Sequence, residues 1–184
     1  MDFYKIFKQR NITIDKDVFD YGYTILKNYF IIFIISMFFS LIFQTLIETL
    51  FFFFSFVWLR RYLGGFHFNN SFCCNFFSLL LIILVPISIK YFLTIDWISL
   101  IIICALSLTL FLIIGPLDHP NKKITKNEKT VFKKKGFIIE IFFLIILLIC
   151  KFFNFNIIVN SICMSFICSS ISQVIALIKI FREQ

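Results

Sequence analysis

The chain has 184 residues, of which 60% are apolar and 29 are Phe, and its formal net charge at pH 7 is +8. Soluble domains carry about 45–50% apolar residues, so this composition excludes a soluble globular domain and indicates a polytopic membrane protein. A chain of this length has no room for a second globular domain. The basic residues lie at the edges of apolar runs, where membrane orientation accounts for them. We therefore expect membrane lipid as a partner and no nucleic acid.

Residues 1–28 mix charges of both signs and lack the apolar core of a removable secretory signal. Apolar residues recur through this segment at helical intervals, which fits an amphipathic helix at the membrane surface and equally a solvated cap on the first span. The sequence thus predicts a cytoplasmic or interfacial segment over residues 1–28 and a single transmembrane domain over residues 29–184.

Five apolar stretches follow this segment, and the first can form either one long tilted helix or a hairpin of two passes through the membrane. A helical span needs about 20 residues, so a hairpin broken near residues 44–48 leaves a short second pass over residues 47–59. The stretches cover residues 29–59, 76–89, 95–114, 137–153 and 157–178.

The distribution of charge gives the expected orientation of these stretches. Besides the N-terminus, Lys and Arg gather at residues 60–61, in the loop 118–136 and near the C-terminus. Basic segments stay in the cytoplasm, which places both termini, the segment 60–74 and this loop on the cytoplasmic side of the cell membrane. The sequence therefore predicts an all-α protein with about six membrane segments, the alternative being four spans with re-entrant segments.

Residues 60–74, RRYLGGFHFNNSFCC, form a polar island between two apolar runs. His67 and Cys74 are seven residues apart, which on an unbroken helix is about 10 Å along the axis and too far for a hydrogen bond of about 3 Å. Gly and Asn favour turns in the segment between them. Ser71 is predicted to cap a helix that starts at Phe72, so Cys74 lies in the first turn, at the positive end of the helix dipole.

This arrangement allows the preceding loop to fold His67 back toward Cys74 as a catalytic pair. The alternative is that His67 packs at the membrane boundary and Cys74 fills space in a Phe-rich run, and spacing alone leaves both open. The cysteines outside the island lie within or at the edge of apolar runs, where Cys behaves as a small hydrophobe; they are Cys104, Cys150, Cys163 and Cys168. No cysteine pair has the spacing of a zinc site, so neither a metal nor another cofactor is expected.

The island resembles the signature of the accessory gene regulator B (AgrB) family, membrane-embedded cysteine endopeptidases of Gram-positive quorum sensing. The resemblance includes an Arg seven residues before the His, a Gly two residues before it and a Cys seven residues after it, here Arg60, Gly65, His67 and Cys74. It extends to a Gly–Pro turn that leads into a lysine-bearing loop, GPLDHPNKK at residues 115–123.

The resemblance implies a reaction and a partner. Cys74 would attack a precursor peptide, with His67 as general base and then acid for the leaving amine. The retained fragment would stay on the enzyme as a thioester, until a thiol or hydroxyl of the substrate closes a thiolactone or lactone autoinducing peptide. Cys73 is a competing nucleophile, one residue away from the family spacing. The resemblance also implies a homodimer.

Four further residues match supporting positions of the family. Arg60 corresponds to a position needed for activity and also serves as a topology anchor, and Gly65 is expected to allow the turn that aims His67. Lys122 and Lys123 are expected to bind the acidic tail of the precursor, with anchoring on the cytoplasmic side as the alternative. No third catalytic residue can be chosen among Asn69, Asn70 and Asp118.

A competing interpretation comes from another functional class, a non-catalytic membrane carrier or export factor for a small peptide. Ionisable residues inside membrane segments often mark transport pathways. Glu48 and Glu140 are the residues of the apolar runs that fit this interpretation.

Overall fold

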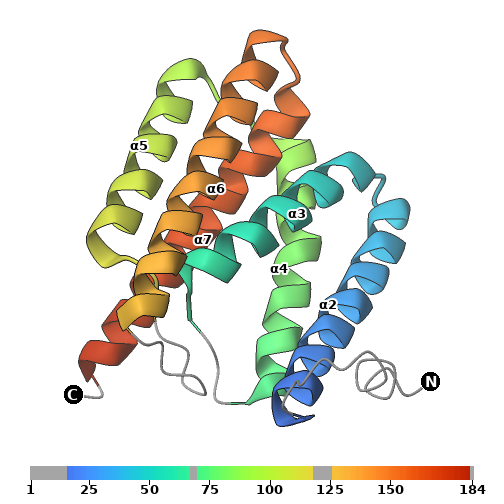
Figure 1. Ribbon diagram of the computed structural model, residues 1–184. Helices are drawn as coiled ribbons and strands as arrows, with labels where there is room; N and C mark the ends of the chain where they lie inside the picture. Colours follow the sequence, from blue (N-terminus) through green and yellow to red (C-terminus); the bar gives the residue numbers. More distant parts are fainter. Residues whose placement is uncertain (1–15, 67–69, 118–125, 183–184) are drawn as a thin grey trace, which may run out of the picture.

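The computed structural model describes residues 16–66, 70–117 and 126–182, and these residues form six helices and no strand (Figure 1). The expected all-α fold is thereby confirmed, and whether all six helices or four of them cross the membrane stays a matter of prediction. The first helix runs without a break across the boundary expected between residues 28 and 29. The helices are α2 (Lys16–Ile42), α3 (Leu46–Leu63), α4 (Ser71–Phe92), α5 (Trp97–Ile114), α6 (Lys126–Phe152) and α7 (Asn156–Arg182).

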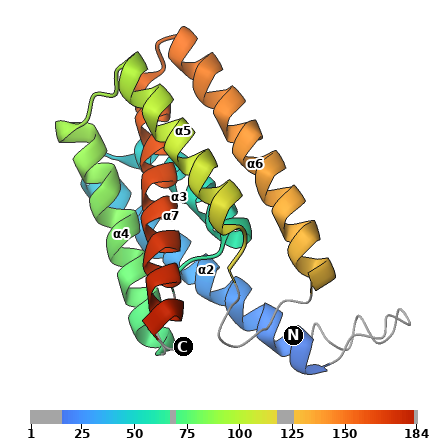
Figure 2. The same ribbon diagram turned by 90° about the vertical axis from the view of Figure 1, so that its left-hand side faces the viewer.

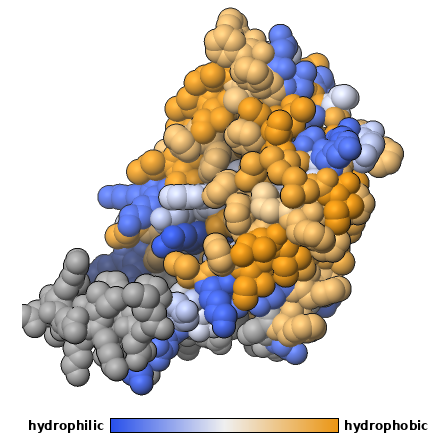
Figure 3. Space-filling view, turned by 90° about the vertical axis from the view of Figure 1, so that its right-hand side faces the viewer, coloured by the Kyte–Doolittle hydropathy of each residue, from blue (hydrophilic) through white to orange (hydrophobic). Residues whose placement is uncertain are grey.

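Four of these helices are long and apolar enough to cross a membrane, and the chain is a multi-pass membrane protein. The spans are Gly22–Ile42, Phe72–Phe92, Trp97–Ile114 and Asn156–Arg182. Hydrophobic residues cover most of the face seen in Figure 3, on which α2 lies. Large apolar side chains of α2 are exposed there at helical spacing, as expected for a surface solvated by lipid rather than water; they include Leu26, Phe30, Ile34, Phe38 and Leu41.

The long first apolar stretch is a helical hairpin, which its length allowed and the distribution of charge predicted. The break lies at residues 43–45, where Gln44 adopts a left-handed φ of 54°. Lys90 of α4 closes this turn, because its Nζ donates to the carbonyls of Gln44 at 2.7 Å and Phe43 at 3.4 Å. The sequence predicted a break near Glu48; this residue is buried and lies within the first turn of α3.

Helix α3 crosses the bundle obliquely and makes its most extensive contact with α7 (Figures 1 and 2). One apolar core lies where α3 meets α5, α6 and α7, and a second lies where it meets α2 and α4. Three small side chains of α7 are completely or almost completely buried at four-residue intervals: Ser161, Ser165 and Ser169. Small residues on one face let membrane helices approach closely, which fits the tight contact of α7 with its neighbours.

The helix ends that flank the polar island and the basic loop lie toward one end of the bundle. The N-terminal ends of α2, α4 and α6 and the C-terminal end of α7 lie in the lower part of Figure 1, and the C-terminal ends of α3 and α5 lie below the N-terminal ends of the same helices. The turns from α2 to α3, from α4 to α5 and from α6 to α7 lie toward the opposite end. This alternation agrees with the arrangement expected from charge, and the cytoplasmic location of the lower end stays a prediction.

Candidate active site at the start of α4

Cys74 lies in the first turn of α4, as the sequence predicted, but the cap of that helix is Asn70 rather than Ser71. Asn70 has extended backbone angles, and its Oδ1 accepts a hydrogen bond from the Phe72 amide at 2.9 Å. Its backbone carbonyl accepts from the Cys74 amide at 3.1 Å. Both Asn and Ser are good caps, and the side chain of Asn70 reaches the second helical amide, so the helix starts one residue earlier, at Ser71.

The turn after α3 is made by Gly64. This residue caps α3 with a φ of 74°, a left-handed conformation that favours glycine, and its amide donates to the Arg60 carbonyl. A Cβ at Gly64 would also lie 3.0 Å from the backbone N and O of Leu117. Gly64 therefore supplies the turn that was expected at Gly65.

Gly65 is needed for a different reason, the close approach of the chain to α7. A Cβ on this residue would lie 2.5 Å from Ser172 Oγ, well inside any normal contact. The next residue, Phe66, donates its amide hydrogen both to Ser172 Oγ and to the Ser172 carbonyl, each at 3.0 Å. Gly65 thus lets the segment that leads to His67 lie directly against α7.

Arg60 connects this segment with the start of α4. Its Nη2 donates to the Phe66 carbonyl at 2.9 Å and approaches Cys74 Sγ to 4.0 Å. Its Nη1 donates to Ser78 Oγ at 3.3 Å. One planar guanidinium therefore contacts the residue immediately before His67, the thiol of Cys74 and a hydroxyl one turn further along α4. These contacts give Arg60 a role beyond that of a topology anchor.

Several predicted site residues lie outside the described part of the chain, and no distance given above involves them. They are His67, Asn69, Asp118, Lys122 and Lys123. The chain is described up to Phe66, the residue before His67, and again from Asn70, the residue after Asn69. Cys73 is half-buried beside Cys74, and no disulfide joins any of the six cysteines.

The four cysteines expected to pack as small hydrophobes do so. Cys104 and Cys163 are buried in the core between α3, α5, α6 and α7, and Cys150 packs against it. Cys168 packs against the core shared by α2, α3 and α4.

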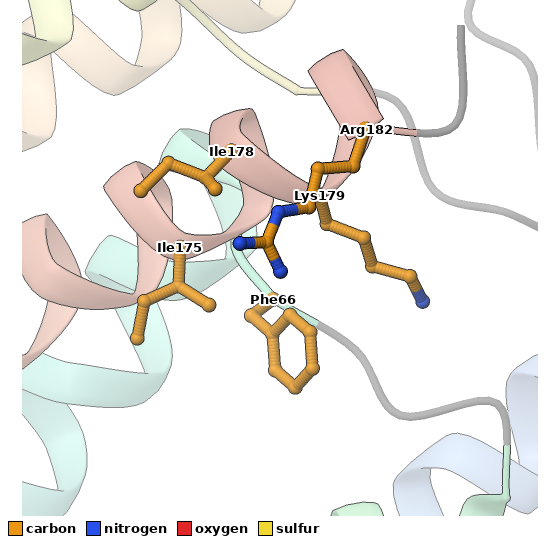
Figure 4. A pocket seen from close by; sticks show the side chains of 5 residues that line it. All are labelled: Phe66, Ile175, Ile178, Lys179 and Arg182. Carbon is orange, nitrogen blue, oxygen red and sulfur yellow. The ribbon is translucent and has the colours of Figure 1, made fainter.

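A pocket of about 320 Å³ opens beside Phe66, at the C-terminal end of α7 (Figure 4). Its walls combine apolar and cationic side chains, and the Arg182 guanidinium extends toward the space between Ile175 and Phe66. Lys179 Nζ lies 5.5 Å from the centre of the Phe66 ring. The lining residues are Phe66, Ile175, Ile178, Lys179 and Arg182.

A family model described as Accessory gene regulator B matches residues 3–176 of the chain. The chain belongs to the AgrB family. No curated protein and no solved structure matches it. The resemblance first drawn from the polar island is thus confirmed, and AgrB membership implies involvement in the processing of accessory gene regulator peptides.

The AgrB match includes every residue that frames Cys74, from Arg60 on α3 to Ser172 on α7. Sequence reasoning found Arg60, Gly65 and Cys74 but missed Ser78 and Ser172, which contact them. The sequence contains only a weak signal for them. Polar residues recur at four-residue intervals through the apolar run of α7, which indicates a buried helix face but does not show which residues it contacts.

Proposed function

We propose that this AgrB protein is a membrane-embedded cysteine endopeptidase that cuts a precursor peptide and supports its cyclisation to a quorum-sensing signal. The observation that carries the proposal is the position of the Arg60 guanidinium. It contacts Cys74 Sγ and holds the carbonyl of Phe66, the residue before His67. A nucleophile and a base have to be held within hydrogen-bond reach of each other, and a shared anchor on α3 supports such a pair.

In the proposed reaction, Cys74 Sγ attacks the scissile carbonyl while His67 accepts the thiol proton. The tetrahedral intermediate collapses, the peptide C–N bond breaks, and His67 returns the proton to the leaving amine. The N-terminal fragment remains on Cys74 as a thioester. A thiol or hydroxyl of that fragment then attacks the thioester carbonyl and gives its proton to His67; the bond from the carbonyl carbon to Cys74 Sγ breaks, the thiolate takes this proton back, and a thiolactone or lactone closes. A tethered nucleophile reaches high effective concentration, and exclusion of water suppresses the competing hydrolysis.

The proposed partner is a precursor with an acidic C-terminal tail, which binds on the cytoplasmic side. Lys122 and Lys123 belong to the loop that leads into α6, and the start of α6 adds further exposed cations near that end of the bundle: Lys129, Lys133, Lys134 and Lys135. Attraction between opposite charges increases the rate of encounter and sets the orientation of a partner, and salt weakens this attraction. This surface supports docking of an acidic segment.

The proposal is tested by co-expressing the protein with a precursor that has an amphipathic start, a central Cys and an acidic tail, and by following the products by mass spectrometry. Cys74→Ala should abolish cleavage, whereas Cys73→Ala should retain most of it. Cleavage at the parent rate by a correctly inserted Cys74→Ala protein would contradict the proposal. In a second arm, replacing the acids of the tail with amides should lower cleavage at low salt; unchanged cleavage would exclude electrostatic docking.

A second candidate function, a non-catalytic carrier of a small peptide, draws on Glu140. This residue is 1% exposed in α6, where Ser107 Oγ donates to its Oε1 at 3.0 Å. Its Oε2 has no hydrogen-bond partner within the described part of the chain, and buried ionisable groups in membrane proteins are often functional. A carrier would export intact precursor, equally well with Cys74→Ala. The same mass spectra therefore separate the two functions.

A further inference from the structure

Ser172, in the last part of α7, holds the backbone one residue before His67. The amide of Phe66 points at two acceptors of this single residue, Oγ and the main-chain carbonyl, each 3.0 Å away. The carbonyl of Phe66 is held from the other side by Arg60 at 2.9 Å. Both main-chain polar groups of Phe66 are therefore fixed, one by α7 and one by α3.

Gln173, the next residue of α7, binds the backbone at the end of α3 and at the end of α5. It is completely buried, and its Nε2 donates to the Gly115 carbonyl at 2.9 Å and to the Leu63 carbonyl at 3.5 Å. Leu63 is the last residue of α3, and Gly115 caps α5. Through Nε2 this side chain joins the ends of two helices that are distant in the sequence, while its buried Oε1 has no hydrogen-bond partner within the described part of the chain.

Close packing on two sides restricts the backbone of the segment 63–66. The Leu117 amide approaches the Leu63 carbonyl to 3.4 Å, and a Cβ on Gly64 would meet the Leu117 backbone. On the opposite side, a Cβ on Gly65 would overlap Ser172 Oγ. The segment is thus confined between the residues that follow α5 and the α7 helix, and a larger residue at Gly65 would have to displace the Ser172 hydroxyl that accepts from Phe66.

We propose that Ser172 and Gln173 are positioning residues for the reaction at Cys74. They act by fixing the backbone from Leu63 to Phe66, and through it the base at position 67, without touching the substrate themselves. This inference rests on the proposed function, since it assigns the pair to the placement of His67. Gln173 extends the same effect to Gly115, the first residue of the segment that carries Lys122 and Lys123.

The contact between Gly65 and Ser172 allows a compensation experiment. Gly65→Ala should lower the rate of precursor cleavage by about tenfold or more, because its Cβ displaces the segment from α7. Ser172→Ala should cost only about two- to fivefold, since the main-chain carbonyl still accepts from Phe66. In the double variant the Cβ added at position 65 would meet only ordinary contacts, so cleavage should return to the level of Ser172→Ala. A double variant no better than Gly65→Ala overturns the proposal.

A second readout separates positioning from a merely structural role. In membranes treated with iodoacetamide, we expect alkylation of Cys74 relative to Cys73, its neighbour on the same helix, to fall with His67→Ala. The proposal predicts a similar fall with Gly65→Ala and recovery in the double variant. Loss of cleavage by Gly65→Ala with an unchanged ratio of alkylation would overturn it.

Gln173→Met keeps the test available if Gly65→Ala does not accumulate. Met conserves the volume but removes the donor to Leu63 and Gly115, so cleavage and the Cys74 to Cys73 ratio should both fall by about tenfold. Ser170→Ala, on a partly buried position of the same helix, is the matched control and should change neither. Unchanged values for an inserted Gln173→Met protein overturn the inference. Cleavage by Cys74→Ala would instead overturn the proposed function itself, so the two failures are distinguishable.

Discussion

Arg60 lies at the polar end of α3 and contacts residues on both sides of the candidate site. Lys and Arg at the ends of membrane helices favour a cytoplasmic location, and the exposed side chain of Arg61 can contribute to this preference. Arg60 is half-buried and uses two nitrogens of its fork to contact Phe66, Ser78 and Cys74. Lysine is a point charge on a flexible stem and cannot reproduce this geometry.

We therefore predict that Arg60→Lys lowers kcat for precursor cleavage while membrane insertion and abundance stay normal. Loss of a hydrogen bond from a charged donor costs about 1.5–3 kcal/mol, or roughly tenfold to a hundredfold in rate. Arg61→Lys is the control and should retain the parent rate. The comparison is made with both proteins in the same membranes at saturating precursor; equal kcat for the two variants would contradict the role given to Arg60.

The candidate site could be proposed from the sequence where the information is local. The spacing of Arg60, His67 and Cys74 is visible in the sequence, and so is a cap before Cys74. The predicted cap, Ser71, was wrong by one residue, because Asn70 before it is an equally good cap. Ser172 could not be predicted as a contact of Phe66, because the two are separated by 106 residues and only the packing of α7 brings them together.

At the scale of elements, the end of α3 differs from the expectation in the way that matters most for the candidate site. The apolar pattern ended its segment at Leu59, but the helix continues through Arg60 and Arg61 to Leu63 and stops at Gly64. A left-handed glycine ends a helix more sharply than a change in polarity does. The extra turn carries Arg60 to the start of α4, so the part of α3 that the hydrophobic pattern missed is the part that reaches the candidate site.

The oblique path of α3 was not predictable from its own sequence. Nearly all of its uncharged residues are apolar, so hydropathy does not show which face is inward. The structure shows that face: Phe52, Phe56, Leu59 and Leu63 are buried at spacings of three and four residues. Helix crossing angles follow from how such ridges fit the grooves of a neighbour, here α7 with its buried serines. The number of helices followed from hydropathy, whereas their packing required both partners.

For the whole molecule, the alternation of helix ends gives a testable topology. Asp96 precedes α5, and Asn154 lies between α6 and α7, both toward the end of the bundle opposite the start of α6 (Figure 1). A membrane-impermeant thiol reagent applied to intact cells should label Cys introduced at Asp96 or Asn154. It should not label Cys introduced at Lys126 until the cells are opened.

The parent chain with its six cysteines gives the background for this experiment. Labelling at position 126 from outside would place the start of α6, and with it the candidate site, on the extracellular side. Failure at both 96 and 154 in intact cells, with labelling after lysis, would contradict the external location of those turns. The proposed function requires the start of α6 and the candidate site to lie on the cytoplasmic side, since the precursor is made in the cytoplasm.

The central claim is that Cys74 carries the substrate as a thioester, and a trapped intermediate tests it most directly. A precursor whose internal Cys is replaced by Ala cannot close the ring, so the thioester should accumulate. After acid quenching, mass spectrometry should show the protein with the N-terminal fragment attached, and hydroxylamine should release it. We predict this adduct in the parent protein and in Cys73→Ala, and its loss in Cys74→Ala. An adduct that persists in Cys74→Ala and disappears in Cys73→Ala would contradict the account.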